Sequence, residues 1–501
     1  MNYKYIFNSL GKVLKLEAVL LLLPFLVSLV YRESSVALYI LLTLILSLGL
    51  GFLLSLIFKK VNSTIFSKEG FILVAFSWIS VSLISALPFY LTKEIPNFID
   101  ALFEAVSGFT TTGATILKNP ENLSHGLLLL RSFNHFIGGM GIIVFITAII
   151  PQSNDKSLYV LRAEMPGPIV DKIHPRSKNT AKILYLIYIG LTALLIILLL
   201  LGGMSFFESL VHAFATAGTG GFGIKVDGIA SYSNYIKWVI AVFMLLFGIN
   251  FNVYFLILIG KFTSAFKSKE LFSYLLIVCS AFVLVSLNIY PLYNNLNDTI
   301  RNSFFQVSSI ITTTGFSIAN FNAWSPTAKT ILLILMFIGG CSGSTAGGLK
   351  VFRISILFKR IKYELKRLIH PDTVEVMTFD GKKIDDKTSH GTASYLALYF
   401  IIIITVTLLV SIDGLSFEAN FSAAVSCMNN IGPGFNEIAS DYSAFSPFSK
   451  VVLTITMLLG RLEIYPILLA FSPYTWLKRF AISRASTRCC FWSEPTGTSS
   501  V

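Results

Sequence analysis

The sequence predicts an all-α polytopic membrane protein with an internal fourfold repeat. Of its 501 residues, 54% are hydrophobic and only 13% are charged, about half the charged share of an average soluble protein. Uncharged apolar runs recur along the chain, and many reach the ~20 residues that a helix needs to cross a bilayer. Four similar segments rich in threonine and glycine recur between these runs. These observations exclude a soluble globular enzyme.

Runs without Asp, Glu, Lys or Arg locate most of the spans. The first span contains Lys15 and Glu17, Lys59 and Lys60 interrupt the second, and Arg461 and Glu463 interrupt the last. The ten predicted spans lie within Val13–Tyr31, Ser34–Thr64, Phe71–Thr92, Ser132–Asn154, Ile183–Phe207, Trp238–Gly260, Leu271–Asn297, Thr330–Leu349, Gly391–Ile412 and Ser449–Phe471.

The basic residues predict the orientation of these spans. When Lys and Arg are assigned alternately to the two sides, 29 of the 39 fall on the side that holds both termini. Cytoplasmic loops retain positive charge, so both termini are expected in the cytoplasm. The net charge of +13 is then explained by loops that face anionic lipid headgroups. No nucleic-acid partner is needed to explain it.

The repeat becomes visible when four loop glycines are aligned. Gly113, Gly221, Gly315 and Gly432 are separated by 108, 94 and 117 residues. Six positions before each glycine lies a small residue, namely Ser107, Ala215, Ser309 and Ser426. Each unit is therefore predicted to contain a span, a short amphipathic helix, a Thr/Gly loop and a second span.

The short helices are too short to cross the membrane. A helix of about ten residues spans ~15 Å, half of the hydrocarbon core, so it must enter and return. Irregular backbone at that depth is tolerated where protein buries it or water bathes it. Four such loops are therefore expected to meet on one axis and line a pore.

A cation filter built from backbone carbonyl oxygens fits these loops, because glycine allows the dihedral angles that aim successive carbonyls inward. The alternative is that the segments are ordinary loops whose glycines pack helices. The predicted filter residues are Thr110, Thr111, Thr112, Gly113, Thr219, Gly220, Gly221, Thr312, Thr313, Thr314, Gly315, Asn430, Ile431 and Gly432.

Several motifs resemble the Trk/Ktr/HKT superfamily of potassium transporters, and most closely its TrkH branch. They are TTTGAT at 110–115, IGGMGIIV at 137–144, TTTGFS at 312–317, GCSGSTAGGLKVFR at 340–353, NNIGPG at 429–434 and GRLEIYP at 460–466. The resemblance covers residues 1 to about 477. It implies selectivity for potassium over sodium, because sodium-selective relatives can carry serine where this chain has Gly113. The tail at 488–501 does not resemble the usual ending of the family and receives no role.

The resemblance also implies a domain organisation, a cargo and partners. Residues 1–66 would form an N-terminal helix pair, 67–155, 156–265, 266–370 and 371–477 the four pore repeats, and 478–501 a cytoplasmic tail. K⁺ would be the transported ion, with no organic cofactor. A homodimer in the cytoplasmic (inner) membrane of a prokaryote is expected. Its partners would be lipids and a TrkA-like nucleotide-binding regulatory subunit docked on the basic segment 350–390.

A glycine-rich segment interrupts the eighth predicted span. A continuous helix would lose about 1 kcal/mol per glycine there, so the helix is expected to break. A phosphate-binding loop is disfavoured, because Leu349 separates Gly348 from Lys350. A glycine interface between helices remains an alternative. The resemblance makes the segment an intramembrane gate below the filter, with candidate residues Gly339, Gly340, Gly343, Ser344, Thr345, Gly347 and Gly348.

Arg461 lies about midway along the last predicted span, where a charge costs ~2.5–3.5 kcal/mol or more. Glu463 is two residues away and points to another side of the helix, so it cannot be an intrahelical partner. Either Arg461 pairs with a carboxylate or carbonyls of a neighbouring helix, or it projects into the pore and opposes cations. The resemblance favours the second role, as part of the gate.

Two other function classes compete with a potassium pore. A secondary transporter of another solute would have inverted repeats around a midplane site, whereas these repeats run in one direction. An intramembrane enzyme needs paired acids, a metal motif or an activated nucleophile, and the spans contain none of these motifs. A sodium-permeable member of the same superfamily remains an alternative, and no enzymatic activity is expected.

Overall fold

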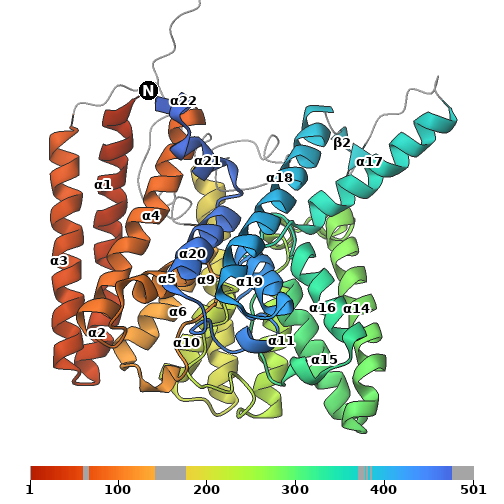
Figure 1. Ribbon diagram of the computed structural model, residues 1–501, viewed down its shortest axis with the longest axis horizontal. Helices are drawn as coiled ribbons and strands as arrows, with labels where there is room; N and C mark the ends of the chain where they lie inside the picture. The colour runs from red at the N-terminus through yellow and green to blue at the C-terminus, as the bar shows by residue number, and fades with distance from the viewer. Residues whose placement is uncertain are drawn as a thin grey trace, which may run out of the picture.

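The protein is described by a computed structural model for residues 2–59, 67–141, 177–370, 378–379, 382–383 and 386–476. Long helices run side by side through the body (Figure 1). Six are long and apolar enough to cross a membrane, and two bent helix pairs would raise that number to eight. The predicted all-α polytopic class is confirmed. In the described part of the chain, the strands are β1 (Thr378–Phe379) and β2 (Lys382–Lys383), which pair antiparallel with Thr378 opposite Lys383.

The N-terminal pair consists of α1 (Tyr3–Leu20) with its continuation α2 (Leu22–Val30), and α3 (Ser34–Ile57). Helix α1 begins ten residues before the predicted span, so Lys12 and Lys15 lie inside it. Helices α1 and α3 pack closely where a Cβ atom on Gly11 would lie 2.7 Å from the carbonyl oxygen of Gly51.

Four repeats follow, each with a span, a pore helix and a second span. Repeat 1 contains α4 (Ser67–Leu91), α5 (Phe98–Phe109) and α6 (His125–Gly139), and repeat 2 contains α9 (Ser177–Leu201), α10 (Phe206–Ala217), α11 (Asn234–Phe247) and α12 (Phe251–Leu258). Repeat 3 contains α14 (Lys269–Tyr293), α15 (Leu296–Ile311), α16 (Pro326–Ile338) and α17 (Val351–Ile369), and repeat 4 contains α18 (Asp386–Val410), α19 (Phe417–Asn429), α20 (Pro447–Arg461) and α21 (Tyr465–Phe471). The short helices η1 (Pro120–Asn122), α13 (Phe262–Phe266), η3 (Phe321–Ala323), η4 (Ser411–Asp413), η5 (Asn436–Ile438) and α22 (Pro473–Trp476) complete the described chain.

The four pore helices α5, α10, α15 and α19 begin in the same way. Each has an Asn or Ser at its N-cap, whose side-chain oxygen accepts a backbone N–H of the first turn; these residues are Asn97, Ser205, Asn295 and Ser416. Such a cap satisfies a donor that the helix itself leaves unpaired. The cap therefore fixes where each pore helix starts.

Two of the predicted spans are not continuous, which corrects the prediction from uncharged runs. Helices α11 and α12 meet at 88°, and α20 and α21 meet at 118°. The bend after α20 places Glu463 and Ile464 at φ values of 54° and 65°. The predicted break in the eighth span is present, because α16 ends at Ile338 and the next helix begins at Val351. The end of the predicted span Ser132–Asn154 and the tail 478–501 lie outside the described residues.

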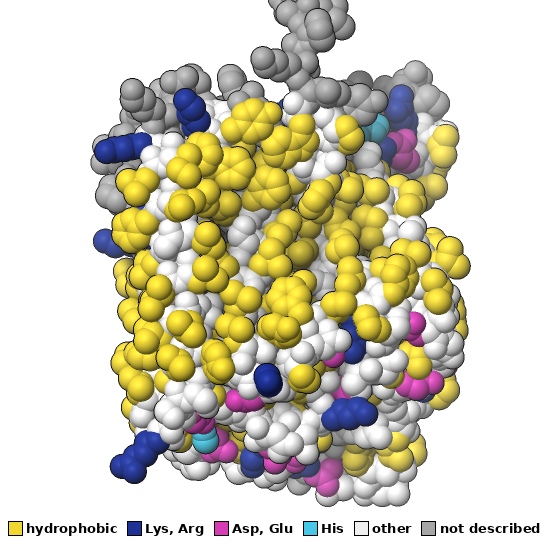
Figure 2. Space-filling view, turned by 60° about the vertical axis from the view of Figure 1, so that its left-hand side comes forward, with side chains coloured by type: hydrophobic (Ala, Val, Ile, Leu, Met, Phe, Trp, Pro, Cys, Tyr) yellow, Lys and Arg dark blue, Asp and Glu magenta, His cyan; other side chains and the backbone are white. Residues whose placement is uncertain are grey.

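The surface and the helix ends fit a membrane protein. Hydrophobic side chains cover the middle of the face shown in Figure 2, whereas charged side chains gather toward its margins. The N-terminus and α22 lie at the same end of the molecule (Figure 1), where the rings of Tyr3 and Trp476 stack at 5.8 Å. The Lys68 ammonium also donates to the carbonyl oxygen of Thr475. The two described ends of the chain are thus held together.

Candidate selectivity filter and gate

Each pore helix ends in a turn with the same unusual backbone. The residue two positions before the aligned glycine is left-handed in every repeat, with φ of 55° at Thr111, 54° at Thr219, 53° at Thr313 and 55° at Asn430. This conformation costs about 1–2 kcal/mol for a residue with a Cβ atom. The aligned glycines have φ between 75° and 104°. Four strained turns of one shape indicate a shared task.

The small residue six positions before each glycine has a structural role. Its carbonyl oxygen accepts the N–H of the residue just before the glycine; the pairs are Thr112 to Ser107, Gly220 to Ala215 and Thr314 to Ser309 at 2.9 Å, and Ile431 to Ser426 at 3.0 Å. This is the six-to-one hydrogen bond of a helix C-terminal cap. It turns the chain so sharply that the carbonyls after the helix leave the helical direction.

The four turns form a closed ring. A Cβ atom on Gly113 would lie 1.9 Å from the carbonyl oxygen of Gly220 in repeat 2. The same distance, from a Cβ atom on the glycine to a carbonyl oxygen of the next repeat, is short in the other three turns. It is 2.0 Å from Gly221 to Thr314 in repeat 3, 2.0 Å from Gly315 to Ile431 in repeat 4, and 2.6 Å from Gly432 to Thr112 in repeat 1. Only glycine permits this approach, and the order of contacts runs once around the four repeats.

Oxygen atoms dominate the chemistry of this ring. The described residues provide no hydrogen-bond donor to the carbonyl oxygens of Thr112, Gly220, Thr314 and Ile431. The hydroxyls of Thr110 and Thr112 lie 2.8 Å apart, as do those of Thr312 and Thr314. The amide of Asn430 donates to the Thr112 hydroxyl at 2.9 Å and joins repeat 4 to repeat 1. Free carbonyl oxygens at close spacing can replace the water shell of a cation.

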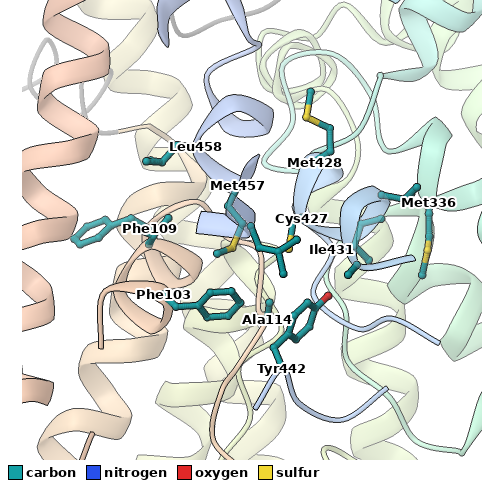
Figure 3. Close-up of a cluster of buried hydrophobic side chains, with 14 of the residues drawn as sticks. Phe103, Phe109, Ala114, Met336, Cys427, Met428, Ile431, Tyr442, Met457 and Leu458 are labelled. Atoms are coloured by element: carbon teal, nitrogen blue, oxygen red, sulfur yellow. The ribbon is translucent and has the colours of Figure 1, made fainter. Parts of the chain in front are cut away.

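A cavity of about 530 Å³ opens on one side of the ring, and all four aligned glycines line it. On the outer side of the turns in repeats 1 and 4, hydrophobic side chains pack tightly. Figure 3 shows Phe103 and Tyr442 beside Ala114, with Ile431 and Met457 nearby. The ring is thus open to a vestibule and supported by a dry core.

A buried ion pair that the sequence did not predict supports the first turn. The Arg131 guanidinium lies 2.7 Å from the Glu104 carboxylate, and the two side chains are 2% and 0% exposed. Glu104 also accepts the Thr115 hydroxyl at 3.0 Å and the backbone N–H of Ile116 at 3.1 Å. The pair joins a glutamate of the pore helix to an arginine of the following span. No other repeat has these two residues at the aligned positions, so the repeat pattern could not predict it.

We expect Glu104→Gln to lower the thermal stability of the protein in detergent, because it leaves the Arg131 charge buried and unpaired, at a cost of about 3–5 kcal/mol. Asp298→Asn is the matched control, since it breaks a more exposed pair with Arg301, whose side chains are 37% and 17% exposed, and exposed ion pairs contribute about 0–1 kcal/mol. Equal losses of melting temperature in the two variants would contradict the supporting role of Glu104.

The loop between α16 and α17 lies directly against the filter. The N–H of Gly347 donates to the Thr313 hydroxyl at 2.6 Å, and the N–H of Gly348 donates to the Asn429 carbonyl at 3.1 Å. A Cβ atom on Gly347 would lie 2.1 Å from that same carbonyl oxygen. The predicted gate segment therefore touches two of the four turns. Gly339 and Gly340 lie where the loop leaves α16 and pack against Gly347 and Ala346.

The bend between α11 and α12 holds the other side of this loop. The Gly248 carbonyl accepts the N–H of Cys341 at 3.0 Å, and the N–H of Phe251 donates to the Gly343 carbonyl at 3.1 Å. The Glu270 carboxylate accepts the N–H of Ser342 at 2.6 Å. This attachment was not predicted, because the uncharged run 238–260 gives no sign of the break that creates it.

Arg461 tethers the loop from a third direction. Its guanidinium donates to the Thr345 carbonyl at 3.0 Å and to the Gly139 carbonyl of α6 at 2.9 Å. Glu463, by contrast, forms a two-pronged pair with Arg353 of α17. Arg461 thus interacts with backbone carbonyls of other elements, and Glu463 points elsewhere, as the sequence predicted.

A second cavity of about 90 Å³ lies on the loop side of the filter. It is lined by Asn430 of the fourth turn, by Gly343, Ser344, Gly347 and Gly348 of the loop, and by Lys350 and Arg461. A path from the vestibule through the ring would continue here, where the loop and two basic side chains narrow it.

The comparisons with known proteins agree with this geometry. A family model described as TrkH, cation transport protein, matches residues 38–476. The chain is 35% identical over 486 residues to the Trk system potassium uptake protein TrkH of Escherichia coli (strain K12), which covers 95% of this chain and 100% of that protein. It is 32% identical over 480 residues to the Trk system potassium uptake protein TrkG of the same strain, covering 95% and 99%. A crystal structure of the potassium transporter TrkH from Vibrio parahaemolyticus superposes with a TM-score of 0.86 at 31% identity, covering 95% of this chain and 100% of that one.

Proposed function

Since the chain belongs to the TrkH family of cation transport proteins, we propose that it takes up K⁺ across the cytoplasmic (inner) membrane of a prokaryote through the ring of four turns. The observation that carries this proposal is the closed series of contacts in which each aligned glycine meets the carbonyl oxygen of the next repeat. A ring of this kind presents oxygen atoms from four directions to one ion.

The proposal assigns the ion contacts to the predicted filter residues of all four turns. Their carbonyl and hydroxyl oxygens are hard neutral ligands, which suit an alkali cation. Glycine at all four aligned positions favours K⁺ over Na⁺ selectivity. Four repeats in the same direction around one axis disfavour a midplane site for an organic solute. In the described residues, no cluster of three or more His, Cys, Asp or Glu could hold a metal ion.

The proposal assigns gating to the loop 339–348 together with Arg461. The loop lines the second cavity together with Asn430 of the fourth turn, and hydrogen bonds attach it to repeats 2, 3 and 4. Arg461 adds a positive charge beside the ion path, which raises the free energy of a cation there. Movement of the loop away from Thr313 would open the path.

The proposed orientation puts both termini in the cytoplasm. It is supported by the excess of Lys and Arg on that side and by the contact between the two described ends of the chain. Helix α17 then extends from the cytoplasmic end, and beyond Arg353 it carries five further basic residues, Lys359, Arg360, Lys362, Lys366 and Arg367. We propose this surface for the TrkA-like nucleotide-binding subunit. The homodimer and the boundaries of the six segments given above remain predictions.

Uptake of radioactive rubidium into liposomes tests the proposed function. We expect uptake by the reconstituted protein to be inhibited by unlabelled K⁺ in preference to Na⁺. Equal inhibition by both ions would indicate the sodium-permeable alternative. Liposomes that take up no rubidium at any membrane potential would refute a potassium pore.

We expect Gly347→Ala to increase rubidium uptake several-fold, because the added methyl group collides with the Asn429 carbonyl and pushes the loop away from the filter. Gly391→Ala in α18 is the matched control, since a Cβ atom there meets nothing within 4 Å. A folded Gly347→Ala protein with normal or reduced uptake would argue against the loop as a gate.

A further inference from the structure

Helix α1 carries a buried carboxyl group that has no role in the filter or the gate. Glu17 is 4% exposed, and neither of its oxygens has a hydrogen-bond partner among the described residues. The only charged side chain close to it in α1, Lys15, places its ammonium 4.0 Å from the centre of the Phe52 ring instead. An unpaired charge in a membrane span is costly, and ionisable groups at such depth mark functional sites.

Glu17 lines a small cavity between α1 and the first repeat. The cavity measures about 20 Å³ and is also lined by Val81 and Ser85 of α4, Phe109 of α5 and Asn134 of α6. Ser85 and Asn134 are its other polar residues, and the Asn134 amide donates to the Ser85 hydroxyl at 2.9 Å. A space of this size holds one water molecule. The remaining wall is apolar.

We propose that Glu17 is a proton-binding site, in which the protonated carboxyl group and one water molecule complete the polar corner formed with Ser85 and Asn134. A proton is favoured over a metal cation by the ligands that the cavity offers. A hard metal ion gathers a shell of about six oxygens, whereas this cavity presents one carboxyl, one hydroxyl and one amide group. Binding a proton instead removes the charge and needs no such shell.

A single residue, Asn134, connects the Glu17 cavity to the helix that carries the first filter turn. Asn134 packs against Gly108 of α5, where a Cβ atom would lie 3.1 Å from the Asn134 Cβ atom. The Gly108 carbonyl accepts the N–H of Thr111, the left-handed residue of the turn, at 3.2 Å. It also binds Nδ1 of His135 at 2.7 Å. Loss of the proton would place a negative charge on Glu17, in the cavity that Asn134 lines. That charge would disturb the contact of Asn134 with Gly108 and therefore the first filter turn.

The other titratable groups near this region face away from the cavity. No second titratable side chain lines it in the described part of the chain. Arg131 of α6 and Glu104 of α5 are paired with each other. His135 faces Gly108 and Gly220. From α4, the residues that line the cavity are Val81 and Ser85, and neither is titratable. A change of pH within the cavity therefore acts through Glu17.

Infrared spectroscopy of the reconstituted protein tests the site without requiring transport. With ¹³C-labelled glutamate carboxyl groups, a protonated Glu17 gives an isotope-shifted C=O stretching band in an apolar environment. We expect Glu17→Gln, which is nearly isosteric, to abolish this band, and Glu418→Gln, an exposed control in α19, to retain it. A band unchanged in Glu17→Gln overturns the proposal. A band that disappears when Na⁺ is added to the wild-type protein at constant pH would identify a metal-cation site and overturn the proton assignment.

The link to the filter rests on the proposed function and is tested separately. We expect rubidium uptake by the wild-type protein to fall several-fold as pH rises through the loss of the infrared band, and uptake by Glu17→Gln to stay level over that range. Identical pH profiles for the two proteins would overturn the link while the infrared result stands by itself. Absence of rubidium transport would refute the proposed pore. The infrared band would still show whether Glu17 is protonated, so the two proposals fail independently.

Discussion

Gly113→Ser is expected to lower the preference for K⁺ over Na⁺ by about tenfold or more, because a loss of ~1.4 kcal/mol in relative binding free energy suffices for that change. The Cβ atom of the serine would lie 1.9 Å from the Gly220 carbonyl oxygen, well inside any real contact. Either the first turn or the second must shift, and one side of the ring then loses its position. The strain of φ +75° at this residue adds to the effect.

Competition of K⁺ and Na⁺ against rubidium uptake in liposomes measures this preference. Gly223→Ala is the matched control, since it lies in the same vestibule but a Cβ atom there has its nearest neighbour at 3.8 Å. We expect the control to keep the wild-type preference. If Gly113→Ser also kept it, with a folded protein, the ring of turns would not be the site of ion selection.

Arg461→Ala is expected to raise rubidium uptake several-fold while the protein remains folded. The substitution removes a positive charge from the second cavity and releases the loop at Thr345. The partners that it leaves behind in the described part of the chain are carbonyl groups, so no described carboxylate is stranded there. Each hydrogen bond lost to a charged group costs roughly 1.5–3 kcal/mol. In the described part of the chain no uncompensated charge remains, and such a charge is what makes a broken buried ion pair cost ~3–5 kcal/mol.

Arg461→Lys separates the charge from the tether, because lysine keeps the positive charge but cannot reach several carbonyls with a planar group. If the charge forms the barrier, the lysine variant should transport slowly, as the wild type does. If the tether forms it, the lysine variant should behave like alanine. Thermal unfolding in detergent accompanies both measurements, and an Arg461→Ala protein that is destabilised without higher uptake would leave Arg461 a structural residue.

Much of the fold was predictable because membrane spans and glycine turns leave strong chemical signatures. Charged residues are rare in spans whatever the spans pack against, so the all-α class and the repeat of span, pore helix and span were predicted and are confirmed. The alignment of Gly113 with its three counterparts was visible because each turn brings a carbonyl oxygen of the next repeat too close for a Cβ atom. The functional roles of the filter and gate residues stay predictions.

The attachments of the gate loop could not be predicted, because they are made by the backbone. At the bend between α11 and α12, the Gly248 carbonyl oxygen accepts the N–H of Cys341. Every residue has a backbone carbonyl, so the sequence does not show which one is the acceptor. The same holds for Arg461, which donates to the carbonyls of Thr345, Gly138 and Gly139. Sequence periodicity also gave no reason to pair Glu463 with Arg353, which lies 110 residues earlier.

The hydrogen bond between Asn430 and Thr112 joins residues 318 positions apart, and this separation sets the order of events during biosynthesis. The ribosome delivers N-terminal segments first, so three turns enter the membrane before the fourth has been translated. Gly315 and Thr112 both lack their neighbours from repeat 4 until then. The ring closes last, so a nascent or prematurely terminated chain lacks the complete ring of four turns.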